Sequence, residues 1–592
     1  MSASNIRQFV EQLRSRGQLR EIVVPVDPHL EIAEIHRRVI AEGGPALLFR
    51  NPTRKNAEKN TRQKFPVVTN LFGTAERVKL AFGQQVCDFI GELARLPHEL
   101  LPPTPQKLWE KRSLFKKALK VGLKRHKRGA VLNQQLAPAR LTDLPALTTW
   151  SLDGGPFITL PLVYTEHPET KIHNLGMYRI QIYDDAQTGL HMQIGKGGGF
   201  HLHRAGELGR KLPVNIFVGG PPALMLAAIS PLPENVPELL FASLALGEKL
   251  QLVDNPLGGL PLIGEAEFAL TGYADPNERR PEGPFGDHYG YYSLVHDFPV
   301  FHCERIYHRN DAIFPATVVG KPRQEDFFIG DYLQEALSPL FPVVMPAVKS
   351  LWSYGETGYH SLAAAVVQNR YKREAMVSAF RILGEGQLSL TKFLLLIDRP
   401  LELKDFRSVL TYVLERVDFR TDLYVFSNLS MDTLDYTGPT LNEGSKGVML
   451  GMGEPIRKLP QEWQGSLPPC VESLKVFSPG CLVISGAKYA DDPELPIRLT
   501  NHAAFADWPL LILADNAEQA TSSVSAFLWQ TFTRFEPAAD IWCRQAKLNR
   551  FHPMLEAPLL IDTRMKPNYP DELFCDEQTS DLVDKRWREY FG

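Results

Sequence analysis

Paired cysteines, long apolar runs and an excess of one charge are all missing from this chain of 592 residues. The six cysteines are scattered and form no CxxC pair, which argues against a disulfide framework and against a zinc site. No apolar run approaches the ~20 residues that span a bilayer, and residues 1–20 form a charged amphipathic pattern unlike a signal peptide. The net charge of −3 gives no bias towards nucleic acid. These absences predict a cytoplasmic enzyme or a large binding protein.

The composition is that of an ordinary globular protein, with 44% hydrophobic and 22% charged residues. Hydrophobic periodicity predicts an α/β (α+β) fold in four parts. The first is an N-terminal α/β domain over residues 1–115, which begins with a helix that has Ile6, Phe9, Val10 and Leu13 on one face and ends at Gly17, followed by a strand over 19–26. The second is a strand-rich, β-barrel-like domain over 116–315, with one helix near 234–246. The last two are a C-terminal α/β domain over 316–460 and a second copy of its subdomain with a tail over 461–592.

The predicted second copy depends on two similar runs in the C-terminal part of the chain. A buried strand at 393–398 leads to a helix with one apolar face and then to a strand at 422–425. The same order recurs between a strand at 510–515 and a strand at 540–542. Chance agreement of two generic strand–helix–strand units is the alternative to a duplication.

Residues 111–128 contain nine Lys and Arg residues and no acidic residue, with leucine and phenylalanine between them. Such a segment is typical of attachment to an anionic membrane surface. A solvated helix face or a linker between domains explains the same composition, and we favour that explanation. Weak association with a membrane surface is kept as the alternative.

The most informative stretch is 281–292, in which Glu282 and Asp287 lie five positions apart. The glycines and proline between them favour a turn or loop over a helix. A histidine and three tyrosines follow at once, and paired acids in such a setting can differ in pKa, one carrying a proton and one staying ionised. A surface turn is the alternative explanation of the pair taken alone.

A second segment, 173–179, places the Asn174 carboxamide and the Arg179 guanidinium five positions apart as the chain enters a strand. Arginine stays charged and forks onto carboxylates or phosphates. The run over 191–199 then combines glycines with Lys196, which suits a phosphate, although a glycine-rich hairpin is the simpler explanation of this run by itself. Further along, Glu238 begins a predicted helix after a proline-rich approach.

These motifs together resemble the UbiD-type decarboxylases, which use prenylated flavin mononucleotide (prenylated FMN, prFMN). The resemblance is carried by residues 174–179, by Glu238 and by residues 282–288, and it runs from the N-terminus to about residue 455. Residues 26–32 and 43–49 also look like the ubiquinone-pathway branch. The resemblance implies an FMN-binding split β-barrel-like domain over 116–315 and a carboxy-lyase activity.

The resemblance also implies roles for the matching side chains. Arg179, Glu282 and Asp287 correspond to an Arg–acid–acid catalytic network with Asp287 as proton donor. Asn174 and Glu238 match positions that hold a divalent metal, usually Mn²⁺, against the flavin phosphate, and oxygen ligands suit such an ion. A potassium ion is a further candidate. The cofactor-contact segments match Met177, Tyr178, Arg179, His191, Met192, Gln193, Lys196 and Gly197.

Two of these assignments leave alternatives open. Lys392 resembles a lysine that reaches the phosphate from the C-terminal domain, but a surface lysine at the edge of a strand is equally consistent. The third metal ligand is His201 in our prediction, with His203 as the alternative. Gly195 stands where a close relative would have histidine, so the usual ligand is missing there.

Covalent cofactor catalysis is the mechanism that the resemblance implies, with the flavin as the electron sink when carbon dioxide departs. Arg179 would orient the substrate carboxylate and help to keep Glu282 ionised. Asp287 would need a raised pKa to carry a proton near neutral pH. We expect burial against the flavin and the tyrosines to raise that pKa.

The end of the chain departs from the shorter ubiquinone-type relatives. Residues 560–566 match the family's closing segment better than residues 448–453 do, so the second copy looks inserted before it as an assembly or spacing element. Long chains of this type resemble the menaquinone-pathway branch. The expected substrate is a hydroxylated aryl acid, either 4-hydroxy-3-polyprenylbenzoate or a dihydroxynaphthoate.

The expected partners are a flavin prenyltransferase that supplies the cofactor and further copies of the chain in a homo-oligomer, without nucleic acid. The expected location is the cytoplasm, or the face of the inner membrane if residues 111–128 attach there. Two other classes remain as alternatives. One is a non-catalytic scaffold that kept the fold, and the other is a peripheral membrane-binding or nucleic-acid-binding protein led by residues 111–128.

Overall fold

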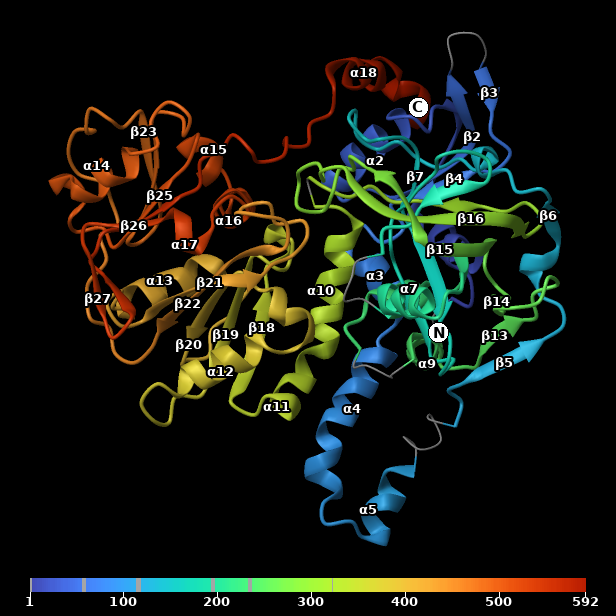
Figure 1. The fold of residues 1–592 in the computed structure, drawn as a ribbon, viewed down its shortest axis with the longest axis horizontal. Helices are drawn as coiled ribbons and strands as arrows, with labels where there is room; N and C mark the ends of the chain where they lie inside the picture. The colour runs from blue at the N-terminus through green and yellow to red at the C-terminus, as the bar shows by residue number, and fades with distance from the viewer. Residues whose placement is uncertain (1–2, 56–59, 113–118, 193–196, 233–236, 322) are drawn as a thin grey trace. The chain divides into compact units, whose positions relative to one another are not determined.

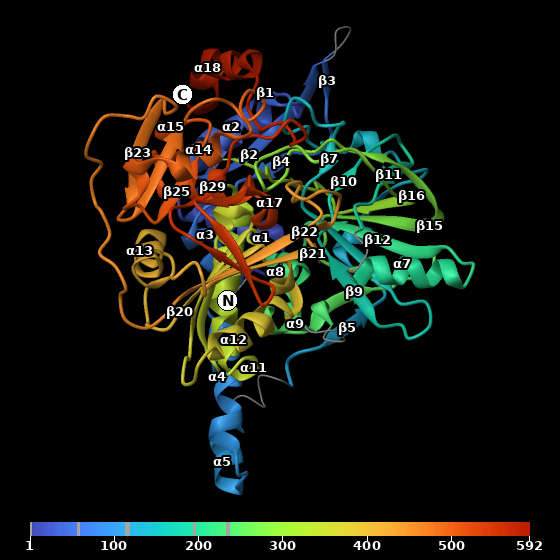
Figure 2. The same ribbon diagram turned by 60° about the vertical axis from the view of Figure 1, so that its left-hand side comes forward.

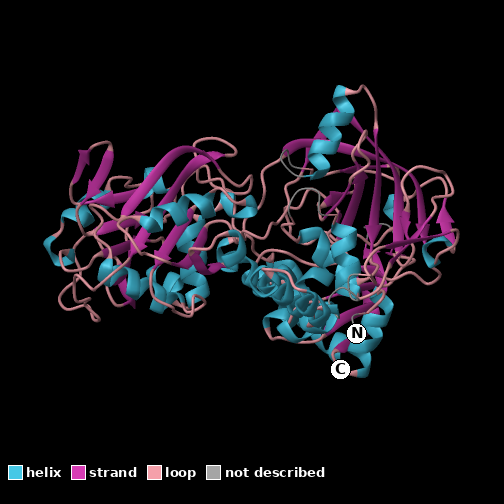
Figure 3. Ribbon diagram, turned by 90° about the horizontal axis from the view of Figure 1, so that it is seen from below, coloured by secondary structure: helices cyan, strands magenta, loops and turns pink. Residues whose placement is uncertain are grey.

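The computed structural model describes residues 3–55, 60–112, 119–192, 197–232, 237–321 and 323–592. The chain forms two units, one made of Met1–Ala336 with Asp571–Gly592 and the other of Leu337–Pro570. Both units contain helices as well as strands (Figure 3), in agreement with the predicted α/β (α+β) class. In the described ranges, no helix combines the length and the apolar character needed to cross a membrane. The four predicted domain boundaries stay a prediction.

The N-terminal part of the first unit is a five-stranded sheet flanked by helices (Figure 1). The predicted first helix is confirmed, because Ile6, Phe9, Val10 and Leu13 are buried on one face and the helix ends before Gly17. The strand order is β1-β2-β4-β17, with β3 paired to β2. The strands are β1 (Leu19–Val26), β2 (Ala46–Lys55), β3 (Asn60–Arg62), β4 (Val67–Thr69) and β17 (Phe314–Pro315), and the helices are α1 (Ile6–Ser15), α2 (Glu31–Ala41) and α3 (Ala75–Phe82).

The last helix of the chain, α18 (Glu577–Phe591), packs on this N-terminal layer against α2 and β1. Tyr590 Oη donates a hydrogen bond of 2.6 Å to Glu31 Oε1, and Val583 and Tyr590 are buried in the same core as β1 and β2. Strand β17 also joins this sheet from far along the chain, pairing in parallel with β4. The N-terminal layer therefore needs segments beyond residue 115 to be complete.

The centre of the first unit is a seven-stranded antiparallel sheet in the order β11-β16-β15-β12-β8-β9, with β6 on β16. Its strands alternate apolar residues into a core that contains Val163, Ile216 and Phe301. The strands are β6 (Gln134–Leu136), β8 (Pro161–Glu166), β9 (His173–Gly176), β11 (Gln187–Gly189), β12 (Leu212–Val218), β15 (Phe268–Glu282) and β16 (His296–His308). The predicted strand-rich region is confirmed.

Three helices accompany this sheet: α7 (Gly197–Glu207), α8 (Pro222–Ile229) and α9 (Glu238–Leu246). The predicted helix near 234–246 is confirmed as α9, which begins at Glu238. The glycine-rich hairpin is wrong in its described part, because Gly197 to Gly199 open α7 instead. Glycine lowers helix stability but leaves room for close neighbours, and both Tyr178 and Asn174 pack against these glycines. Residues 193–196 lie outside the described residues.

Part of the basic segment 111–128 is a strand, which neither the membrane-attachment nor the helix-or-linker interpretation predicted. Leu123–His126 forms strand β5, which pairs in parallel with β13 (Leu250–Val253) in a small sheet completed by β14 (Leu262–Ile263). Helices α4 (Gln85–Leu100) and α5 (Pro105–Glu110) precede it and extend away from the central sheet (Figure 2). Residues 113–118 lie outside the described residues. Two further elements of the first unit are the β7 (Phe157–Ile158) and β10 (Ile180–Gln181) pair and α10 (Glu325–Leu337).

The second unit contains two five-stranded sheets that repeat one arrangement. In the sheet β18-β19-β20-β22-β21, the three central strands are parallel and both edge strands are antiparallel to them. The sheet β23-β24-β25-β29-β26 has the same directions in the same order. The identical pattern supports a duplication.

The elements of these two sheets are as follows. The first sheet has β18 (Val348–Ser353), β19 (Leu362–Val367), β20 (Phe393–Ile397), β21 (Leu423–Ser430) and β22 (Glu443–Gly451), with α11 (Phe341–Val344), α12 (Glu374–Leu383) and α13 (Phe406–Arg416). The second has β23 (Ser473–Ser478), β24 (Cys481–Ser485), β25 (Leu510–Leu513), β26 (Ile541–Cys543) and β29 (Leu559–Asp562), with α14 (Leu495–Asn501), α15 (Ala517–Thr521), α16 (Val524–Thr533), α17 (Pro537–Asp540) and the hairpin β27 (Ala546–Asn549) and β28 (His552–Leu555).

Candidate active site

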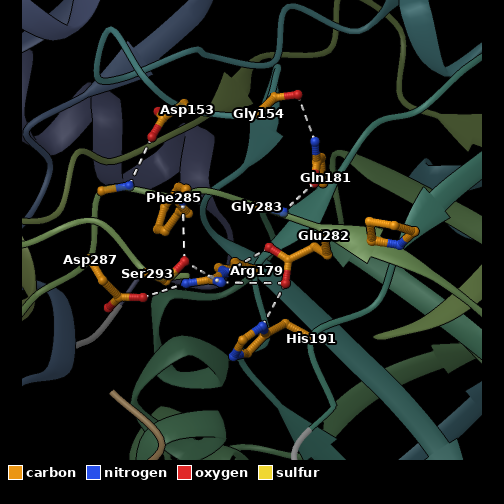
Figure 4. A network of polar contacts seen from close by, with 12 residues as sticks. Asp153, Gly154, Arg179, Gln181, His191, Glu282, Gly283, Phe285, Asp287 and Ser293 are labelled. Atoms are coloured by element: carbon orange, nitrogen blue, oxygen red, sulfur yellow. Dashed lines mark hydrogen bonds and ion pairs between the residues drawn. The ribbon is translucent and has the colours of Figure 1, made fainter. Parts of the chain in front are cut away.

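One end of the central sheet brings the predicted Arg–acid–acid residues together. Arg179 lies in the short link between β9 and β10, and Glu282 is the last residue of β15. Asp287 lies in the loop that follows β15, where glycine and proline prevent the strand from continuing. Figure 4 shows the three side chains in contact.

The Arg179 guanidinium is shared between the two carboxylates. Its Nε lies 2.9 Å from Glu282 Oε1, and its Nη1 lies 2.5 Å from Asp287 Oδ2. Nη2 donates to Glu282 Oε2 at 3.4 Å and to Ser293 Oγ at 2.9 Å. The ring of Phe285 lies under the guanidinium, 4.8 Å from Cζ. Arg179 is thus held flat and charged between two acids and an aromatic face.

Glu282 is fully buried and yet remains an anion. Burial acts to raise the pKa of this carboxyl, but the hydrogen bond from His191 and the charge of Arg179 outweigh burial and hold the pKa below its usual range. His191 Nδ1 lies 2.7 Å from Glu282 Oε2. Burial and the nearby Arg179 lower the pKa of His191, so this imidazole is neutral at neutral pH. The predicted ionised state of Glu282 is confirmed.

The expectation of a raised pKa at Asp287 is wrong. Burial does act to raise the pKa, but the hydrogen bond and the charge of His288, together with the charge of Arg179, hold it well below its usual range. His288 Nδ1 lies 2.6 Å from Asp287 Oδ1, and the His288 backbone N–H donates to the same oxygen at 2.7 Å. Sequence reasoning counted the burial and the tyrosines but not the neighbouring histidine turned onto the carboxylate.

Ser293 is a site residue that sequence reasoning missed. Its buried hydroxyl accepts hydrogen bonds from Arg179 Nη2 and, at 3.2 Å, from the backbone N–H of Phe285. It therefore ties the guanidinium to the loop that carries Asp287. An isolated serine one residue beyond the aromatic stretch gave no signal in the sequence.

A second group of residues missed by the sequence analysis fixes the start of this loop (Figure 4). Gln181 Oε1 accepts from the Gly283 N–H at 2.8 Å, and Gln181 Nε2 donates to Gly154 O at 2.7 Å. Asp153 Oδ1 accepts from the Gly286 N–H at 2.8 Å. Glycine is needed at 283, where the backbone has a φ of +100°.

The end of the loop pairs with a short segment close to the C-terminus. The Tyr292 N–H donates to Asp571 O, and the Leu573 N–H donates to Gly290 O, both at 3.0 Å. Leu573 is buried with Trp150 and Tyr292. The tail that sequence analysis assigned to the second copy therefore braces the loop of Asp287.

The predicted metal residues Asn174 and Glu238 lie next to each other beside this network. Glu238, the first residue of α9, accepts a hydrogen bond of 3.2 Å from the backbone N–H of Leu175, the residue that follows Asn174. Burial raises the pKa of the Glu238 carboxyl. Among the described groups, hydrogen bonds from backbone N–H groups act against this rise. A nearby cation would stabilise the ionised form of this buried carboxyl.

His201 on α7 is connected to the same strands through Thr165. His201 Nδ1 lies 2.9 Å from Thr165 Oγ1, and Thr165 is the cross-strand partner of Asn174. Such partners point to the same face of a sheet. Burial, with the charges of His167 and His173, lowers the pKa of His201 to about 4, so its ring is neutral. The described residues contain no group of three His, Cys, Asp or Glu side chains placed to hold a metal by themselves.

A small cradle lies where the cofactor segments were predicted. A Cβ on Gly197 would overlap Asn174 Oδ1, and a Cβ on Gly198 would lie 3.0 Å from Met192 Cε. Tyr178 Oη lies 3.4 Å from Asn174 Nδ2. The Gly198 backbone N–H bonds to the Tyr178 hydroxyl, and Asn174 Oδ1 lies against Gly197, so polar side chains line the start of α7. A helix N-terminus is a place where an anion is stabilised. The residues present fit a phosphate group with a divalent cation beside it.

The remaining predicted cofactor residues fall into three groups. Met177 is half-buried in the segment between Asn174 and Arg179. Gln193 and Lys196 lie outside the described residues. Lys392 belongs to the second unit, where it is buried and its Nζ lies 2.8 Å from Asp435 Oδ2. A surface lysine is therefore excluded, while contact with a phosphate stays a prediction.

Comparisons with known proteins cover nearly the whole chain. Models of 3-octaprenyl-4-hydroxybenzoate carboxy-lyase match its N-terminal domain over residues 10–96, its Rift-related domain over 124–322 and its C-terminal domain over 327–451. An uncharacterized protein of Chlamydia trachomatis is 51% identical over 99% of this chain and 100% of its own length. A Chlamydia pneumoniae protein that is named as part of a 4-hydroxybenzoate decarboxylase is 49% identical over 99% and 98%.

Solved structures with the same fold include two enzymes of low sequence identity. The closed form of vanillic acid decarboxylase from Sedimentibacter hydroxybenzoicus has a TM-score of 0.65 and 24% identity, over 79% of this chain and 96% of that one. An evolved dimeric form of the UbiD-class enzyme HmfF from Pelotomaculum thermopropionicum, in complex with prFMN, has a TM-score of 0.59 and 20% identity, over 79% and 97%. With the three family models and the Arg179–Glu282–Asp287 network, these matches show that the chain belongs to the UbiD family of carboxy-lyases.

Proposed function

We propose that the protein removes carbon dioxide from a hydroxylated aromatic carboxylic acid with the help of prenylated FMN and a divalent metal ion. The observation that carries this proposal is the single guanidinium of Arg179 shared by Glu282 and Asp287. A buried guanidinium between two ionised carboxylates is an unusual arrangement. Buried charged groups with shifted pKa values are typical of catalytic sites.

The flavin proposal is supported by the cradle at the start of α7. Gly197 and Gly198 let the side chains of Asn174 and Tyr178 approach the start of this helix closely, and a helix N-terminus suits a phosphate. The HmfF structure with prFMN is a family neighbour of this fold. We propose Met177, Tyr178, Arg179, His191, Met192, Gln193, Lys196, Gly197 and Lys392 as cofactor contacts, with a flavin prenyltransferase as the supplier.

A divalent ion, with Mn²⁺ as our choice, would be held by Asn174, Glu238 and His201. The carboxylate and carboxamide oxygens are hard ligands, and a neutral imidazole can complete such a set. Glu238 has a raised pKa from burial, and a cation would favour its ionised form. We make no residue assignment for a potassium ion.

The bound cofactor would supply an electron sink for the carbon that loses its carboxylate. Each side chain then has one task. Arg179 orients the substrate carboxylate, since its guanidinium is always charged. Glu282 stays ionised and holds Arg179 in place, and His191 holds Glu282 from its other oxygen. Asp287 delivers a proton to the carbon after carbon dioxide leaves.

The proposed substrate is 4-hydroxy-3-polyprenylbenzoate or a dihydroxynaphthoate, in quinone biosynthesis. The name of the Chlamydia pneumoniae relative supports a hydroxybenzoate ring. The family description, which names an octaprenyl-hydroxybenzoate, supports a prenylated ring. A homo-oligomer is proposed as the assembly, and an evolved form of the family member HmfF is described as dimeric.

Association with an anionic membrane surface is a second proposal, for residues 111–128 together with residues 101–110 that precede them. Their described part exposes Leu101, Trp109 and Leu119 among lysines and arginines, which combines apolar and cationic groups on one stretch. Flotation with vesicles that contain anionic lipid tests it. Binding that weakens as salt rises supports the proposal, and absence of binding at low salt contradicts it.

Mass spectrometry of the molecules released from the denatured protein tests the cofactor proposal. The protein is produced together with a flavin prenyltransferase and supplied with Mn²⁺. We expect prenylated FMN in equimolar amount, and loss of most of it in a Glu238→Gln variant. Absence of the flavin from wild-type protein, with prenyltransferase activity verified, would contradict the proposal and favour the non-catalytic scaffold.

A further inference from the structure

The first sheet of the second unit has a crevice at the carboxyl ends of its parallel strands. Helix α12 follows β19 and packs on one face of the sheet, whereas α13 follows β20 and packs on the other face. Where neighbouring strands send their connections to opposite faces, a crevice opens at the strand ends, and α/β proteins bind ligands there. A cavity of about 450 Å³ lies at this edge, and a second of about 350 Å³ shares Asn369 and Arg370 with it and reaches Asp398 after β20.

This crevice lies at the opposite edge of the sheet from Lys392, the proposed cofactor contact of the second unit. Lys392 directly precedes β20, so it stands at the amino end of that strand. The strand has five residues, and about 16 Å therefore separate its two ends. The larger cavity has a size that suits a small molecule. It is thus a candidate site that none of the proposed catalytic or cofactor residues of this sheet explains.

Two kinds of side chain line the larger cavity. Arg370, Lys372 and Arg373 come from the loop after β19. Leu450 and Met452 come from the end of β22 and the turn that follows it. Cationic groups beside apolar ones suit a molecule that carries an anionic group on an apolar body.

One positive charge of this loop has no counterion among the described residues. Glu374 Oε1 lies 2.5 Å from Arg370 Nη2, and Asp422 Oδ1 lies 2.6 Å from Arg373 Nη1. Lys372 is exposed and forms no such ion pair within the described part of the chain. Helix α12 begins at Glu374, so its N-terminus adds a partial positive charge at the same edge.

The second copy of the subdomain shows the corresponding place in a filled state. One hydrogen bond common to both copies fixes the correspondence. The N–H of Gly453 donates to Asp398 Oδ2 at 2.8 Å, and the N–H of Met565 donates to Asp515 Oδ2 at 3.0 Å. The strand pairing agrees, since Leu396 and Leu513 each face the residue three positions before that N–H. Leu450 thus corresponds to Asp562, and Met452 corresponds to Arg564.

In the second copy a buried ion pair occupies this place. Arg564 is fully buried, and its Nη2 lies 2.7 Å from Asp562 Oδ2. Its Nη1 donates to the backbone oxygens of Ala487 at 2.8 Å and Asp492 at 2.9 Å, both in the loop after β24. That loop, residues 486–494, has three acids and one lysine. An acidic loop therefore receives its cation from the chain itself.

The first copy has the opposite charge in its loop and no internal counterpart. Residues 368–373 contain three cations and no acid. The two positions that hold the ion pair in the second copy hold Leu450 and Met452 here, which bring no charge to the loop. By comparison with the second copy, the group that this crevice lacks is an anion.

We propose that the crevice at the carboxyl ends of β19, β20 and β22 binds a small organic anion. Lys372 and Arg373 hold its carboxylate or phosphate group. Leu450 and Met452 contact its apolar body. The second copy does not bind this ligand, because Arg564 fills the corresponding place. The proposal adds a small-molecule site to the second unit and is independent of the proposed decarboxylase activity.

Methyl NMR of the cofactor-loaded enzyme with ¹³C-labelled methionine tests the site. The probes share one ring and differ in one group: benzoate, phenyl phosphate and the neutral benzyl alcohol. We expect at least one anion to give a saturable shift of the Met452 methyl signal, with an affinity at least about tenfold higher than that of benzyl alcohol. Met452→Leu identifies the signal. Met177 and Met192, in the other unit, report separately on binding near Arg179.

A charge reversal in the exposed loop tests the role of its cations. Lys372→Glu should weaken binding of the anion about tenfold or more, read from the same Met452 signal. Lys475→Glu, at an exposed lysine on β23, is the matched control and should bind the anion as wild type does. Equal affinities of wild type and Lys372→Glu would overturn the proposal.

A double variant tests the comparison with the second copy. Leu450→Asp combined with Met452→Arg places the ion pair of the second copy in the cavity of the first. Calorimetry should then show one fewer bound anion per chain than in wild type, and thermal unfolding shows whether the variant is folded. If it does not fold, Lys372→Glu decides. An unchanged number of bound anions in the folded variant would contradict the site.

The two anionic probes distinguish the chemical group that the site takes. Binding of benzoate alone assigns a carboxylate, binding of phenyl phosphate alone assigns a phosphate, and either result supports the site. Absence of a saturable Met452 shift with both anions would refute it, and so would equal affinity for benzyl alcohol. None of these readings depends on turnover, so a failure of the proposed decarboxylase function would leave them unchanged.

Discussion

At the scale of single residues, Arg179 sets the charge balance of the site. Its three nitrogens bind Glu282, Asp287 and Ser293, so each partner is also a constraint on where the guanidinium points. Of these, Ser293 is neutral and serves as an acceptor for two donors at once. Its hydroxyl therefore affects the orientation of Arg179 without changing any charge.

Ser293→Ala tests that positional role. The change leaves two buried donors, on Arg179 and on Phe285, without their acceptor, so we expect a loss of about 1–3 kcal/mol in the free energy of unfolding. Misorientation of Arg179 should lower kcat/KM about tenfold or more. Urea unfolding and steady-state kinetics measure the two effects.

Ser473→Ala is the matched control, because it removes a similar hydroxyl hydrogen bond, to Ser485, in the second unit. It should lower stability without lowering kcat/KM. Equal kinetics in Ser293→Ala and Ser473→Ala would show that Ser293 has no part in orienting Arg179.

At the scale of elements, α7 and α9 present their N-termini to strand β9. Gly197 begins α7 against Asn174, and Glu238 begins α9 against the backbone of Leu175. Two positive helix ends beside one carboxylate and one carboxamide would suit the phosphate and cation that we propose. The absence of a side chain at Gly197 is what permits the contact.

Gly197→Ala should therefore damage cofactor binding more than folding. The added methyl group overlaps Asn174 Oδ1 and must displace either the carboxamide or the helix start. We expect the flavin content of purified protein to fall at least severalfold, measured by absorbance against protein concentration. Gly91→Ala, within α4, is the control, because its added Cβ would meet only Arg95 Nη1 at 3.9 Å among the described residues; it should bind flavin as wild type does. Full flavin content in Gly197→Ala would contradict the proposed phosphate cradle.

At the scale of the whole molecule, segments far apart in sequence complete each layer of the first unit. Strand β17 and helix α18 finish the N-terminal layer, and residues 571–573 brace the loop of Asp287. The chain passes through the whole second unit before it returns to form α18 and the contacts of residues 571–573. Truncation near residue 570 would thus remove support from the site itself.

Local patterns in the sequence were enough to predict α1, β1, α9 and the strand-rich centre, because each depends on periodicity within a few turns. The Arg179–Glu282–Asp287 set followed from motif resemblance. The ionisation of Asp287 could not follow, since it depends on how His288 turns onto one oxygen. The helix start at Gly197 was missed because glycines favour a turn in the sequence and tertiary contacts override that preference. The packing of α18 on α2 and β1 was missed because no local pattern in the sequence identifies a distant partner.

Buried titratable groups of the N-terminal layer predict how stability changes with pH. Burial and the charges of Arg37 and Arg77 lower the pKa of His36 to about 3, while Gln324 bonds its ring. In the unfolded chain this histidine binds a proton below about pH 6.5, whereas in the folded protein it stays neutral until about pH 3. Low pH therefore favours the unfolded chain, and the contribution of His36 to stability falls as pH drops from about 6.5 towards 3.

The variant His36→Gln tests this contribution, in a site where Glu325 Oε2 lies 4.0 Å from His36 Nε2. Glu325 acts in the opposite sense, since its raised folded pKa of about 7 makes stability fall as pH rises from about 4.5 to 7. The free energy of unfolding of wild type minus that of His36→Gln should therefore increase as pH rises from 4 to 6.5. Urea unfolding measures this difference. A difference that stays constant over this range would mean that His36 titrates normally in the folded protein.

Release of carbon dioxide by the cofactor-loaded enzyme tests the central claim most directly. Wild type should release carbon dioxide from a hydroxylated aryl acid, while Arg179→Ala and Glu282→Gln should be slower by roughly a hundredfold or more with the flavin still bound. Near-normal release by either variant, at equal flavin content, would contradict the assignment of the Arg179–Glu282–Asp287 network as the catalytic site.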